Sequence, residues 1–445
     1  MKVPQRPPST ERVQATLAAL ATKDPSVLAV RPEDRYLHWD ELRRRSPPEG
    51  LDHETWWAVL KLGRAFTRSH VPLVDERGGA FGWSSTSGIT EQLHAIDLWA
   101  GGHVGFAEPI VNRESQAQYY LSSLITEAIT SSQLEGASTT REVAEEMLLS
   151  KRKPRDTGER MILNNYLTMK RIHELKTEPL TPALVFELHR LVTADTLERP
   201  DAAGRFRRAD ERIAVVDNDD QVLHDPPPAE TLPARLRALC DFANGKTPNG
   251  FVHPALRAIV LHFWLAYDHP FVDGNGRTAR ALFYWSMLRS GYWLFEYVSI
   301  SEVILRAPVK YGRAFLLTET DDNDLTYFVL YHLQVIRESL DNLKRYIAKK
   351  ADDVRSLDGV LRLAADRFNH RQRELLSHAL RHPTQVYTIA EHQARQGVVY
   401  QTARTDLLSL AEQGLLVQST AGKKLVFRPV RDLEKRLRRL GDESS

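Results

Sequence analysis

Residues 269–280 read HPFVDGNGRTAR, and this stretch decides how the middle of the chain is interpreted. The apolar residues before it recur at helical spacing as far as Tyr267, and the same periodicity resumes after Gly276 and continues through Leu288. Between the two runs, the proline and glycine residues interrupt regular structure. The pattern predicts a helix, a tight glycine loop and a second helix.

The predicted loop has the composition of an anion site. Gly274 and Gly276 let the backbone approach a ligand closely. The loop leads into a helix, whose N-terminus presents unpaired N–H groups and a positive partial charge. Arg277 and Arg280 lie three residues apart, so we expect both side chains to point to one side and to hold phosphate oxygens. The stretch therefore predicts a site for several phosphates in a row.

Two further residues add chemistry to this site. Asp273 supplies a carboxylate, and magnesium typically takes one or two carboxylates together with phosphate oxygens. His269, at the end of the first helix, is placed to take a proton from an incoming hydroxyl. The residues by themselves indicate a metal-assisted reaction at a phosphate.

Two other kinds of enzyme stay open on the residues alone. His262, His269 and Asp273 could be the ligands of a metal-dependent hydrolase. His269 and Asp273 could also form the HxxxD pair of an acyltransferase. Neither interpretation explains Arg277 and Arg280.

The stretch resembles, without a gap, the signature HxFx(D/E)GNGRxxR of the Fic family of protein adenylyltransferases. The resemblance covers roughly residues 115–340. It implies a mainly α-helical domain with a small β-hairpin flap. It also implies that the chain uses ATP and Mg²⁺ to transfer AMP to a hydroxyl side chain of a protein, the chain itself included.

Within the signature, the resemblance implies a catalytic set and an ATP-binding set. The catalytic residues are His269, as the general base, together with Asn275 and Arg277. The ATP-binding residues are Phe271, Gly274, Asn275, Gly276, Arg277 and Arg280. Phe271 would anchor the loop, Arg280 would reach the γ-phosphate, and Asp273 would hold the magnesium ion.

A hairpin signal interrupts the helical pattern before the signature. Residues 213–216 and 221–223 are apolar stretches on either side of Asp217–Asp220, a run that favours a turn. In the Fic family such a hairpin is a flap that aligns the target segment as an added strand, which needs only backbone pairing. The target-docking residues would be Ile213, Val215 and Val216.

Residues 131–136 read SSQLEG and lie before the signature. They are similar to the inhibitory pattern (S/T)xxxE(G/N) of the family, with Ser131, Glu135 and Gly136 at the defined positions. A glutamate paired with Arg280 would take the partner of the γ-phosphate and repel the triphosphate, so we expect an autoinhibited enzyme. The same letters also fit an ordinary helix that ends with a glycine cap.

The chain departs from the family near the expected adenine site, where it has Lys310-Tyr311-Gly312 in place of paired tyrosines. Relatives of this fold transfer phosphate, UMP or phosphocholine, and some remove AMP. Transfer of another phosphate-containing group, or de-AMPylation with Glu135 positioning a water, therefore stays open beside AMP transfer.

Four regions are expected along the chain. Residues 1–110 form an N-terminal packing or docking region, with helices and several tryptophans. The catalytic domain spans 111–345 and includes the inhibitory helix at about 115–136. A winged-helix domain spans 356–430, and a basic tail spans 431–445, in which residues 431–440 are expected to form a solvated helix.

The winged-helix prediction rests on order and charge. Between residues 366 and 430 nine Lys or Arg face five Asp or Glu, and three helical segments precede a strand-like pair. The third helix and the wing carry side chains suited to nucleic acid: Tyr400, Gln401, Thr402, Arg404, Lys423 and Lys424. A DNA-binding regulator is therefore the alternative from another class, and the same unit could instead contact a protein.

The composition indicates which partners and which cellular compartment suit the protein. The chain has 445 residues, 42% of them hydrophobic and 27% charged, and a formal charge of +2 argues against bulk attraction to nucleic acid or anionic lipid. Cys240 is the single cysteine, and its apolar helical surroundings predict a buried thiol in a reducing compartment. We expect a cytoplasmic protein without a signal peptide or membrane segment, and a homodimer stays open.

Overall fold

The computed structural model describes residues 2–23, 35–101, 113–217, 219–363, 367–382, 385–421 and 424–442. The chain divides into two compact units, Met1–Leu343 and Lys344–Ser445. The predicted boundary at residue 110 falls outside the described residues. The finer division into four regions therefore stays a prediction.

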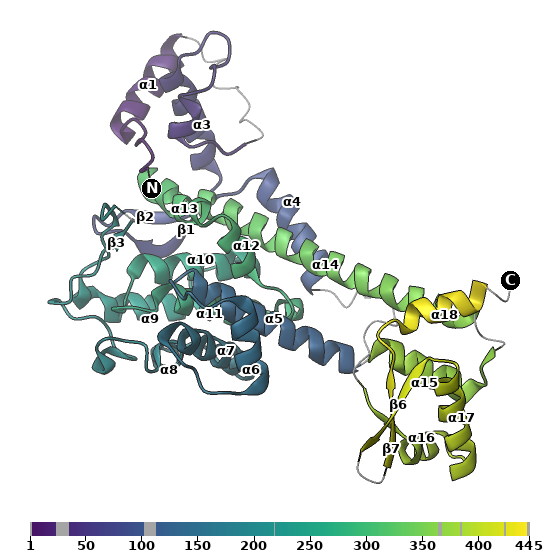
Figure 1. Ribbon diagram of the computed structural model, residues 1–445. Helices are drawn as coiled ribbons and strands as arrows, with labels where there is room; N and C mark the ends of the chain where they lie inside the picture. Colours follow the sequence, from purple (N-terminus) through teal and green to yellow (C-terminus); the bar gives the residue numbers. More distant parts are fainter. Residues whose placement is uncertain are drawn as a thin grey trace. The chain divides into compact units, whose positions relative to one another are not determined.

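The first unit is mainly helical and is built around two consecutive helices, α10 (Pro254–Asp268) and α11 (Asn275–Arg289) (Figure 1). Both are buried on nearly every face, which is the pattern of a helix that lies inside a domain. Four helices pack directly on this pair: α5 (Arg113–Gln133), α7 (Thr157–Leu175), α8 (Pro182–Thr193) and α9 (Leu232–Ala243).

Local sequence explains where the central helices begin and end. Pro254 stands in the first turn of α10, where its missing N–H is not needed. The helix ends at His269, which has φ +44°, and α11 starts after Gly274, which has φ +78°. The predicted order of a helix, a tight glycine loop and a second helix is confirmed.

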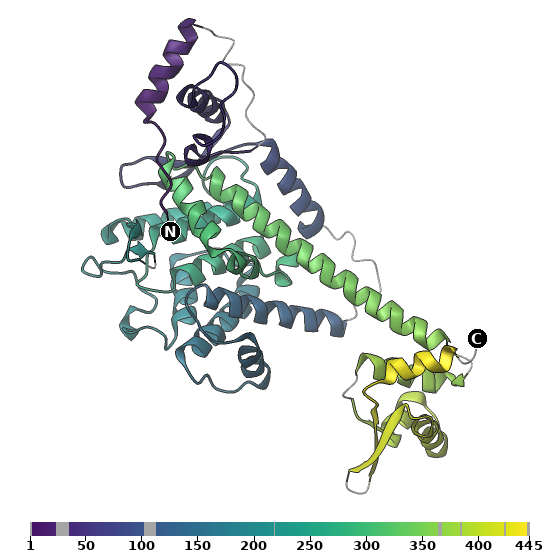
Figure 2. The ribbon, with the colours of Figure 1, turned by 45° about the horizontal axis from the view of Figure 1, so that its top comes forward.

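The remaining helices complete the first unit. Three short helices lie within it: α6 (Arg141–Ser150), α12 (Ile300–Arg306) and α13 (Pro308–Thr320). The long helix α14 (Thr326–Leu363) begins in the first unit and contributes Phe328, Leu333 and Ile336 to its main core (Figure 2). Residues 113–175 contain three helices, α5, α6 and α7, because the chain leaves the helical conformation at Gly136, with φ +92°, and at Lys151, with φ +56°.

The N-terminal part of this unit contains both helices and a hairpin. Its helices are α1 (Thr10–Lys23), α2 (Trp39–Leu42), α3 (His53–Phe66) and α4 (Ser87–Ile96). The strands β1 (Arg68–Val74) and β2 (Ala80–Ser84) pair antiparallel and were not predicted. Trp39, Trp56 and Trp57 share a small core of their own, whereas Trp83 belongs to the main core.

Buried polar contacts join this N-terminal part to the turn between α13 and α14. The Tyr36 hydroxyl donates to Asp324 at 2.6 Å, and Lys61 forms an ion pair with Asp321 at 2.8 Å. Because Asp321 is fully buried, breaking this pair would leave an uncompensated charge. The tryptophan-rich N-terminal part is thus packed on the rest of the first unit.

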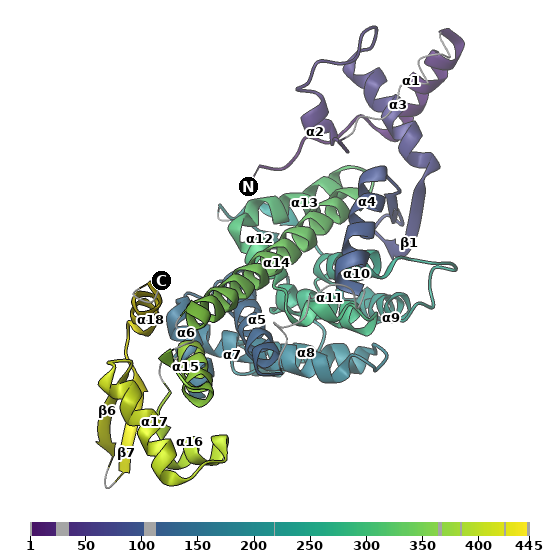
Figure 3. The same cartoon turned by 90° about the vertical axis from the view of Figure 1, so that its right-hand side faces the viewer.

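After the end of α14, the described residues of the second unit form three helices, a three-stranded sheet and a final helix. The helices are α15 (His370–Arg381), α16 (Ile389–Gln396) and α17 (Tyr400–Glu412). The strands β5 (Tyr387–Thr388), β6 (Leu416–Ala421) and β7 (Lys424–Pro429) form an antiparallel sheet in the order β5-β7-β6, and Figure 3 shows the long β6–β7 pair beside α17. This order agrees with a winged helix.

The expectation of a solvated tail is wrong for the described residues. Residues Leu433–Asp442 form α18, and Leu433 and Leu437 are buried in the core of the second unit. The spacing of four residues puts both leucines on one helix face, while the basic residues cover the other.

Cys240 and membrane insertion are the two remaining structural expectations. Cys240 is a free, buried cysteine on α9, and burial raises the pKa of its thiol to about 12, so it is unreactive at neutral pH. Among the helices that the structure describes, none is long and apolar enough to cross a membrane.

Candidate functional site

The site lies where the chain turns between α10 and α11. The Asn275 side chain closes this turn by bonding to both backbone polar groups of Phe271. Its Oδ1 accepts the Phe271 N–H at 3.0 Å, and its Nδ2 donates to the Phe271 carbonyl at 2.8 Å. The side chain is thus committed to the shape of the loop, and the backbone N–H of Asn275, at the start of α11, is open to a ligand.

His189 on α8 packs against the loop and bonds to its backbone. Its ring stacks on Phe271 with 3.7 Å between the ring centres. Because Nδ1 accepts the Gly204 N–H at 2.9 Å, Nε2 carries the hydrogen and donates to the Asp273 carbonyl at 2.9 Å. Burial lowers the pKa of His189 to about 4, so the ring is neutral and keeps this arrangement at physiological pH.

Arg207 fixes the beginning of the loop. Its Nε donates to the His269 carbonyl at 2.9 Å, another of its N–H groups donates to the Pro227 carbonyl, and its backbone N–H donates to Pro270 at 2.9 Å. These bonds hold His269 in its left-handed conformation, which by itself costs about 1–3 kcal/mol for a residue with a side chain. Sequence reasoning missed both Arg207 and His189.

His269 has the protonation state that a general base requires. Its Nδ1 lies 3.3 Å from the Ala266 carbonyl, which can only accept, so Nδ1 carries the hydrogen and the lone pair is on Nε2. Burial lowers the pKa of His269 to about 4. The imidazole is therefore neutral near pH 7 and able to take a proton.

Arg277 presents open donors inside the protein. The side chain is fully buried, and Nη1 donates to the Val192 carbonyl at 2.8 Å. Nε and Nη2 are buried without a hydrogen-bond partner among the described residues, and Nη2 is 3.5 Å from an oxygen of Asp273. Buried guanidinium donors in this state are costly unless an anion completes them, so the geometry favours an anion site beside the loop.

Arg280 is engaged differently from Arg277, although the sequence suggested that both would face one ligand. Its Nε donates to the Ser131 hydroxyl at 2.8 Å, and its Nη2 donates to the Ser131 carbonyl at 2.9 Å and to Glu135 at 2.8 Å. Arg280 is 1% exposed. Its charge is thus satisfied by the end of α5.

The Glu135 carboxylate lies against the first turn of α11. A Cβ atom added to Gly276 would collide with Oε1 of Glu135, so only glycine leaves room for this contact. Burial alone raises the pKa of Glu135, but the Arg280 guanidinium outweighs burial and holds the pKa below its usual range. A carboxylate anion therefore stands at the helix N-terminus where phosphates were predicted, and Gly136, with φ +92°, ends α5 as a glycine cap.

Asp273 fits a magnesium ion that is held mostly by phosphates. Its side chain is 52% exposed, and Oδ1 accepts the Gly274 N–H. Among the described residues no group of three or more His, Cys, Asp or Glu side chains could hold a metal ion. One exposed carboxylate beside an anion site suits magnesium, which keeps most of its ligands from water and phosphate.

The metal-dependent hydrolase interpretation is wrong for the described residues, because they contain no three-ligand group. His262 is 0% exposed, and its Nε2 is 2.8 Å from the Tyr311 hydroxyl. Burial lowers the pKa of His262 well below its usual value. The ring is therefore a neutral part of the core and not a ligand at the loop.

The predicted hairpin is present as β3 (Val215–Val216) and β4 (Val222–His224), with Val215 opposite His224. Ile213 precedes β3 and is half-buried, whereas Val216 is 47% exposed. His224 anchors the returning strand, since its Nε2 donates to the Tyr267 carbonyl at 2.7 Å and its Nδ1 contacts Glu319 at 2.7 Å.

His224 should titrate at higher pH than an ordinary histidine. Burial alone lowers its pKa, but the Glu319 carboxylate outweighs burial and raises it above 6.5. The charged contact therefore stabilises the fold fully below the unfolded-state pKa of about 6.5, and this contribution is lost as pH rises through the higher folded-state pKa. Histidine NMR should show the raised pKa, and Glu319→Gln should lower it; an unchanged pKa in that variant would contradict the assignment.

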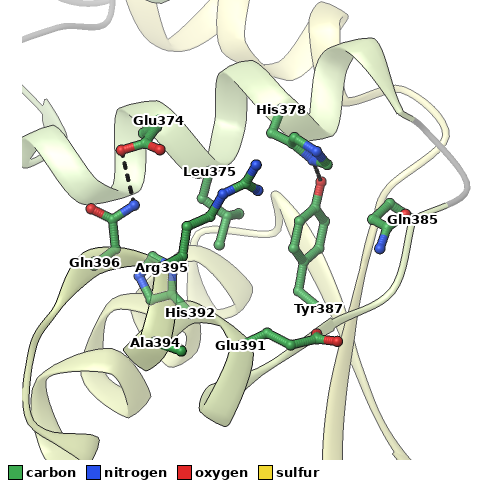
Figure 4. Close-up of a pocket in the computed structure, with 10 residues that line it drawn as sticks. All are labelled: Glu374, Leu375, His378, Gln385, Tyr387, Glu391, His392, Ala394, Arg395 and Gln396. Carbon is green, nitrogen blue, oxygen red and sulfur yellow. Dashed lines mark hydrogen bonds between the residues drawn. The ribbon is translucent and has the colours of Figure 1, made fainter. Parts of the chain in front are cut away.

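The second unit contains a separate cavity of about 550 Å³ between α15, β5 and α16 (Figure 4). Arg395 points into it, His378 lies 2.7 Å from the Tyr387 hydroxyl, and Gln396 donates to Glu374 at 2.9 Å. Every residue that lines the cavity belongs to the second unit, so the cavity is no part of the site at the loop.

Comparison with known proteins gives the following matches. The Fic/DOC family pattern matches residues 179–287. Protein adenylyltransferase Fic from Nematostella vectensis is 30% identical over 166 residues, which are 37% of this chain and 34% of the relative. The Drosophila grimshawi protein of the same name is 32% identical over 182 residues, 40% of this chain and 34% of the relative. The chain thus spans about a third of the length of these relatives.

A solved structure shows a similar fold. The crystal structure of a Fic family protein from Desulfovibrio desulfuricans G20 superposes with a TM-score of 0.54 and 18% identity, covering 78% of this chain and 98% of that one. At this identity the likeness concerns the fold alone. It agrees with the mainly helical architecture described above.

Proposed function

Because residues 179–287 of this chain form a Fic/DOC-family domain, we propose that the protein is an adenylyltransferase that moves AMP from ATP to a hydroxyl side chain of a protein. One observation carries the proposal. Two buried N–H-bearing atoms of Arg277, in the first turn of α11, have no hydrogen-bond partner among the described residues, and the loop that precedes this turn begins with the neutral His269. A polyphosphate would complete these donors next to a base.

The chemistry follows from the residues around the loop. A target Ser, Thr or Tyr hydroxyl would give its proton to Nε2 of His269 as its oxygen attacks the α-phosphorus. The new O–P bond forms as the bond from the α-phosphorus to the bridging oxygen breaks, and pyrophosphate leaves. Backbone N–H groups of residues 274–276 and the Arg277 guanidinium would hold the phosphate oxygens, while Asn275 and Phe271 keep the loop in shape.

Asp273 would hold Mg²⁺, which when bound neutralises charge on the phosphates. The exposed Asp273 carboxylate supports this role. Ile213, Val215 and Val216 would align the target segment on the flap by backbone pairing, and the exposed Val216 supports that role.

We further propose that the enzyme is inhibited by its own Ser131–Gly136 segment. Glu135 contacts Arg280, which would otherwise reach the γ-phosphate, and its carboxylate lies against Gly276. A triphosphate that enters this arrangement meets a like charge and lacks one partner, so ATP would bind in an orientation poor for attack.

The Glu135→Gly variant tests the proposed reaction. The variant is incubated with ATP labelled in the α or the γ position, in the presence of a cell extract. We expect protein to be labelled from the α position only, because AMP carries the α-phosphate. Label from the γ position alone would mean a kinase and would reject AMP transfer. Absence of protein label from both positions, with release of AMP from an AMP-modified protein by the unmodified chain, which keeps Glu135, would favour removal.

The pH profile gives a second test of His269. Its pKa of about 4 means that the base is neutral over the whole range near pH 7 and becomes protonated only as pH falls through about 4. We expect transfer by Glu135→Gly to be nearly constant between about pH 6 and 8 and to decline only toward acid. An inflection near pH 6.5, at which the fold is intact by circular dichroism, would show an unperturbed base.

The nucleotide preference is a finer proposal. Tyr311 contacts His262 at 2.8 Å, and the chain has no second tyrosine at 310 or 312. We propose ATP as the donor because the relatives are named adenylyltransferases. Competition of unlabelled UTP or CDP-choline with labelled ATP measures the preference directly.

The second unit offers a second candidate function, DNA contact by a winged helix. Val399 is 68% and Tyr400 53% exposed at the start of α17, where a recognition helix meets bases. Of the two lysines expected on the wing, Lys424 is exposed and Lys423 lies outside the described residues. Retention of a duplex by the full chain that weakens with salt, and weakens again in Arg404→Ala, would support DNA contact. The reducing cytoplasm and a homodimer stay proposals.

A further inference from the structure

The inhibitory segment is attached to the site at more points than the sequence pattern contains. Glu127, Ser131 and Glu135 follow one another at intervals of four, so they share one side of α5 and its final turn. Arg280 and Tyr284 have the same spacing on α11. Ser131 and Glu135 contact Arg280, and Glu127 contacts Tyr284, so the contacts form a ladder between the two helices.

Glu127 is the member of this ladder with the most side-chain hydrogen bonds. It is 2% exposed, and its two oxygens lie within hydrogen-bond distance of four donors. One oxygen accepts from the Tyr284 hydroxyl at 2.8 Å, the Ser299 hydroxyl at 2.8 Å and the Ser301 N–H at 3.1 Å. The other accepts from the Ser301 hydroxyl. Glu127 thus joins α5 to α11 and to the start of α12.

The Glu135 contact is weaker on its own. Glu135 lies two residues beyond the last residue of α5, and its side chain is 24% exposed, so water competes for the carboxylate. Ordering a helix end for a single ion pair also costs conformational entropy. The contact therefore depends on α5 being docked already, and the Glu127 network, two helical turns earlier, is where polar contacts dock it.

We propose that Glu127 is the positioning residue of the autoinhibition, so that the strength of inhibition is set at a buried carboxylate remote from the phosphates. This inference rests on the proposed function of the site. Glu127 makes no hydrogen bond to the loop or to Arg280, although its charge attracts the Arg280 guanidinium, and it acts on the phosphate site through Ser131 and Glu135. A signal that relieves inhibition would need only to disturb the packing of α5 on α12 at Ser299 and Ser301.

Two substitutions separate the hydrogen bonds from the packing. Glu127→Met keeps a side chain of similar length but removes every acceptor, so the Ser301 N–H loses its partner. Glu127→Gln keeps the oxygen that accepts three bonds and places an NH₂ group toward the Ser301 hydroxyl, which can turn and accept. Glu159→Met is the matched control, because Glu159 is equally buried but bonds to Arg152 and the Arg155 N–H.

The first readout is transfer of α-labelled AMP by the full chain. Glu127→Met should raise basal transfer about tenfold, since the loss of one or two net hydrogen bonds shifts the docked equilibrium by about that factor. Glu127→Gln should stay near the unmodified chain. Adding Glu127→Met to Glu135→Gly should give no further increase, because both changes act on the same brake. An additive increase, or an equal increase in Glu159→Met, would overturn the proposal.

Hydrogen exchange provides the second readout and does not depend on activity. Peptides from residues 120–137 should exchange faster in Glu127→Met, while peptides from α10 and α11 stay protected. If Glu127→Met does not fold, Tyr284→Phe removes one of the four donors and should give a smaller change in the same direction. Faster exchange without AMP transfer in Glu135→Gly would reject the enzyme function and keep the anchor. Transfer in Glu135→Gly with unchanged exchange in Glu127→Met would reject the anchor alone.

Discussion

His269→Ala, introduced into the Glu135→Gly variant, is expected to lower AMP transfer about 1000-fold, the middle of the range that a general base contributes. The reason is specific to this histidine. Its Nδ1 hydrogen is held by the Ala266 carbonyl, which leaves Nε2 free to accept, and burial keeps the ring neutral. Alanine at this position removes the only neutral imidazole of the loop, while Arg277 and the α11 N-terminus remain.

The measurement is the initial rate of label transfer from α-labelled ATP, together with the affinity for ATP by calorimetry. The affinity should change little, because His269 is assigned to the proton and not to the phosphates. His94→Ala is the matched control, since His94 is exposed on α4. A variant that lacks His269 yet transfers AMP within tenfold of its parent would remove the base assignment.

Glu135→Gly is expected to raise basal transfer about 10-fold to 100-fold. Glu135 makes a charge-assisted hydrogen bond to Arg280, and bonds of this kind contribute about 1.5–3 kcal/mol, which corresponds to that factor. Removal frees Arg280 for the γ-phosphate and takes a negative charge from the first turn of α11. Both changes favour productive binding of a triphosphate.

Glu135→Gln is the informative companion. It keeps the length of the side chain and the hydrogen bond to Arg280 but removes the charge, so its rate should lie between those of the unmodified chain and Glu135→Gly. The affinity for ATP, measured for all three in the absence of a target, should rise in the same order. Equal rates in the unmodified chain and Glu135→Gly would mean that this contact does not limit the reaction.

The central helices and the loop could be predicted because their signal is local. Gly274 and Gly276 interrupt two apolar helical runs, and the resemblance is carried by twelve consecutive residues. The contact between Glu135 and Arg280 was also expected, because the inhibitory pattern contains Glu135 and the HxFx(D/E)GNGRxxR signature contains Arg280. In these cases the sequence contains the whole interaction within short motifs.

The supports of the loop could not be predicted in the same way. Arg207 bonds to the carbonyls of His269 and Pro227, and His189 bonds to the carbonyl of Asp273. Every residue has a carbonyl, so such contacts leave no pattern in the sequence. Glu127 was missed for a related reason, since its partners are common hydroxyls more than 150 residues away.

Two features near the ends of the chain were missed for other reasons. The hairpin β1–β2 contains Pro72, and its apolar stretches are short. Both features weaken the alternation of apolar and polar residues that is expected of strands. The helix α18 was expected, but the burial of one of its faces was not. Leu433 and Leu437 are four residues apart on that face, and the many basic residues of the tail suggested that it was solvated.

The Asn275 amide shapes the loop, and it is also a group that can be lost slowly by a chemical reaction. Asn275 is followed by Gly276, and an asparagine before glycine is open to attack on its side-chain carbonyl by the next backbone nitrogen, which releases ammonia and leaves aspartate or isoaspartate. Both ends of this amide are bonded to Phe271, which holds the side-chain carbonyl away from that attack while the protein is folded. After conversion, a carboxylate would face the Phe271 carbonyl, and the loop would lose its closure. In stored preparations that partly unfold, Asn275 should therefore lose this protection and convert with time.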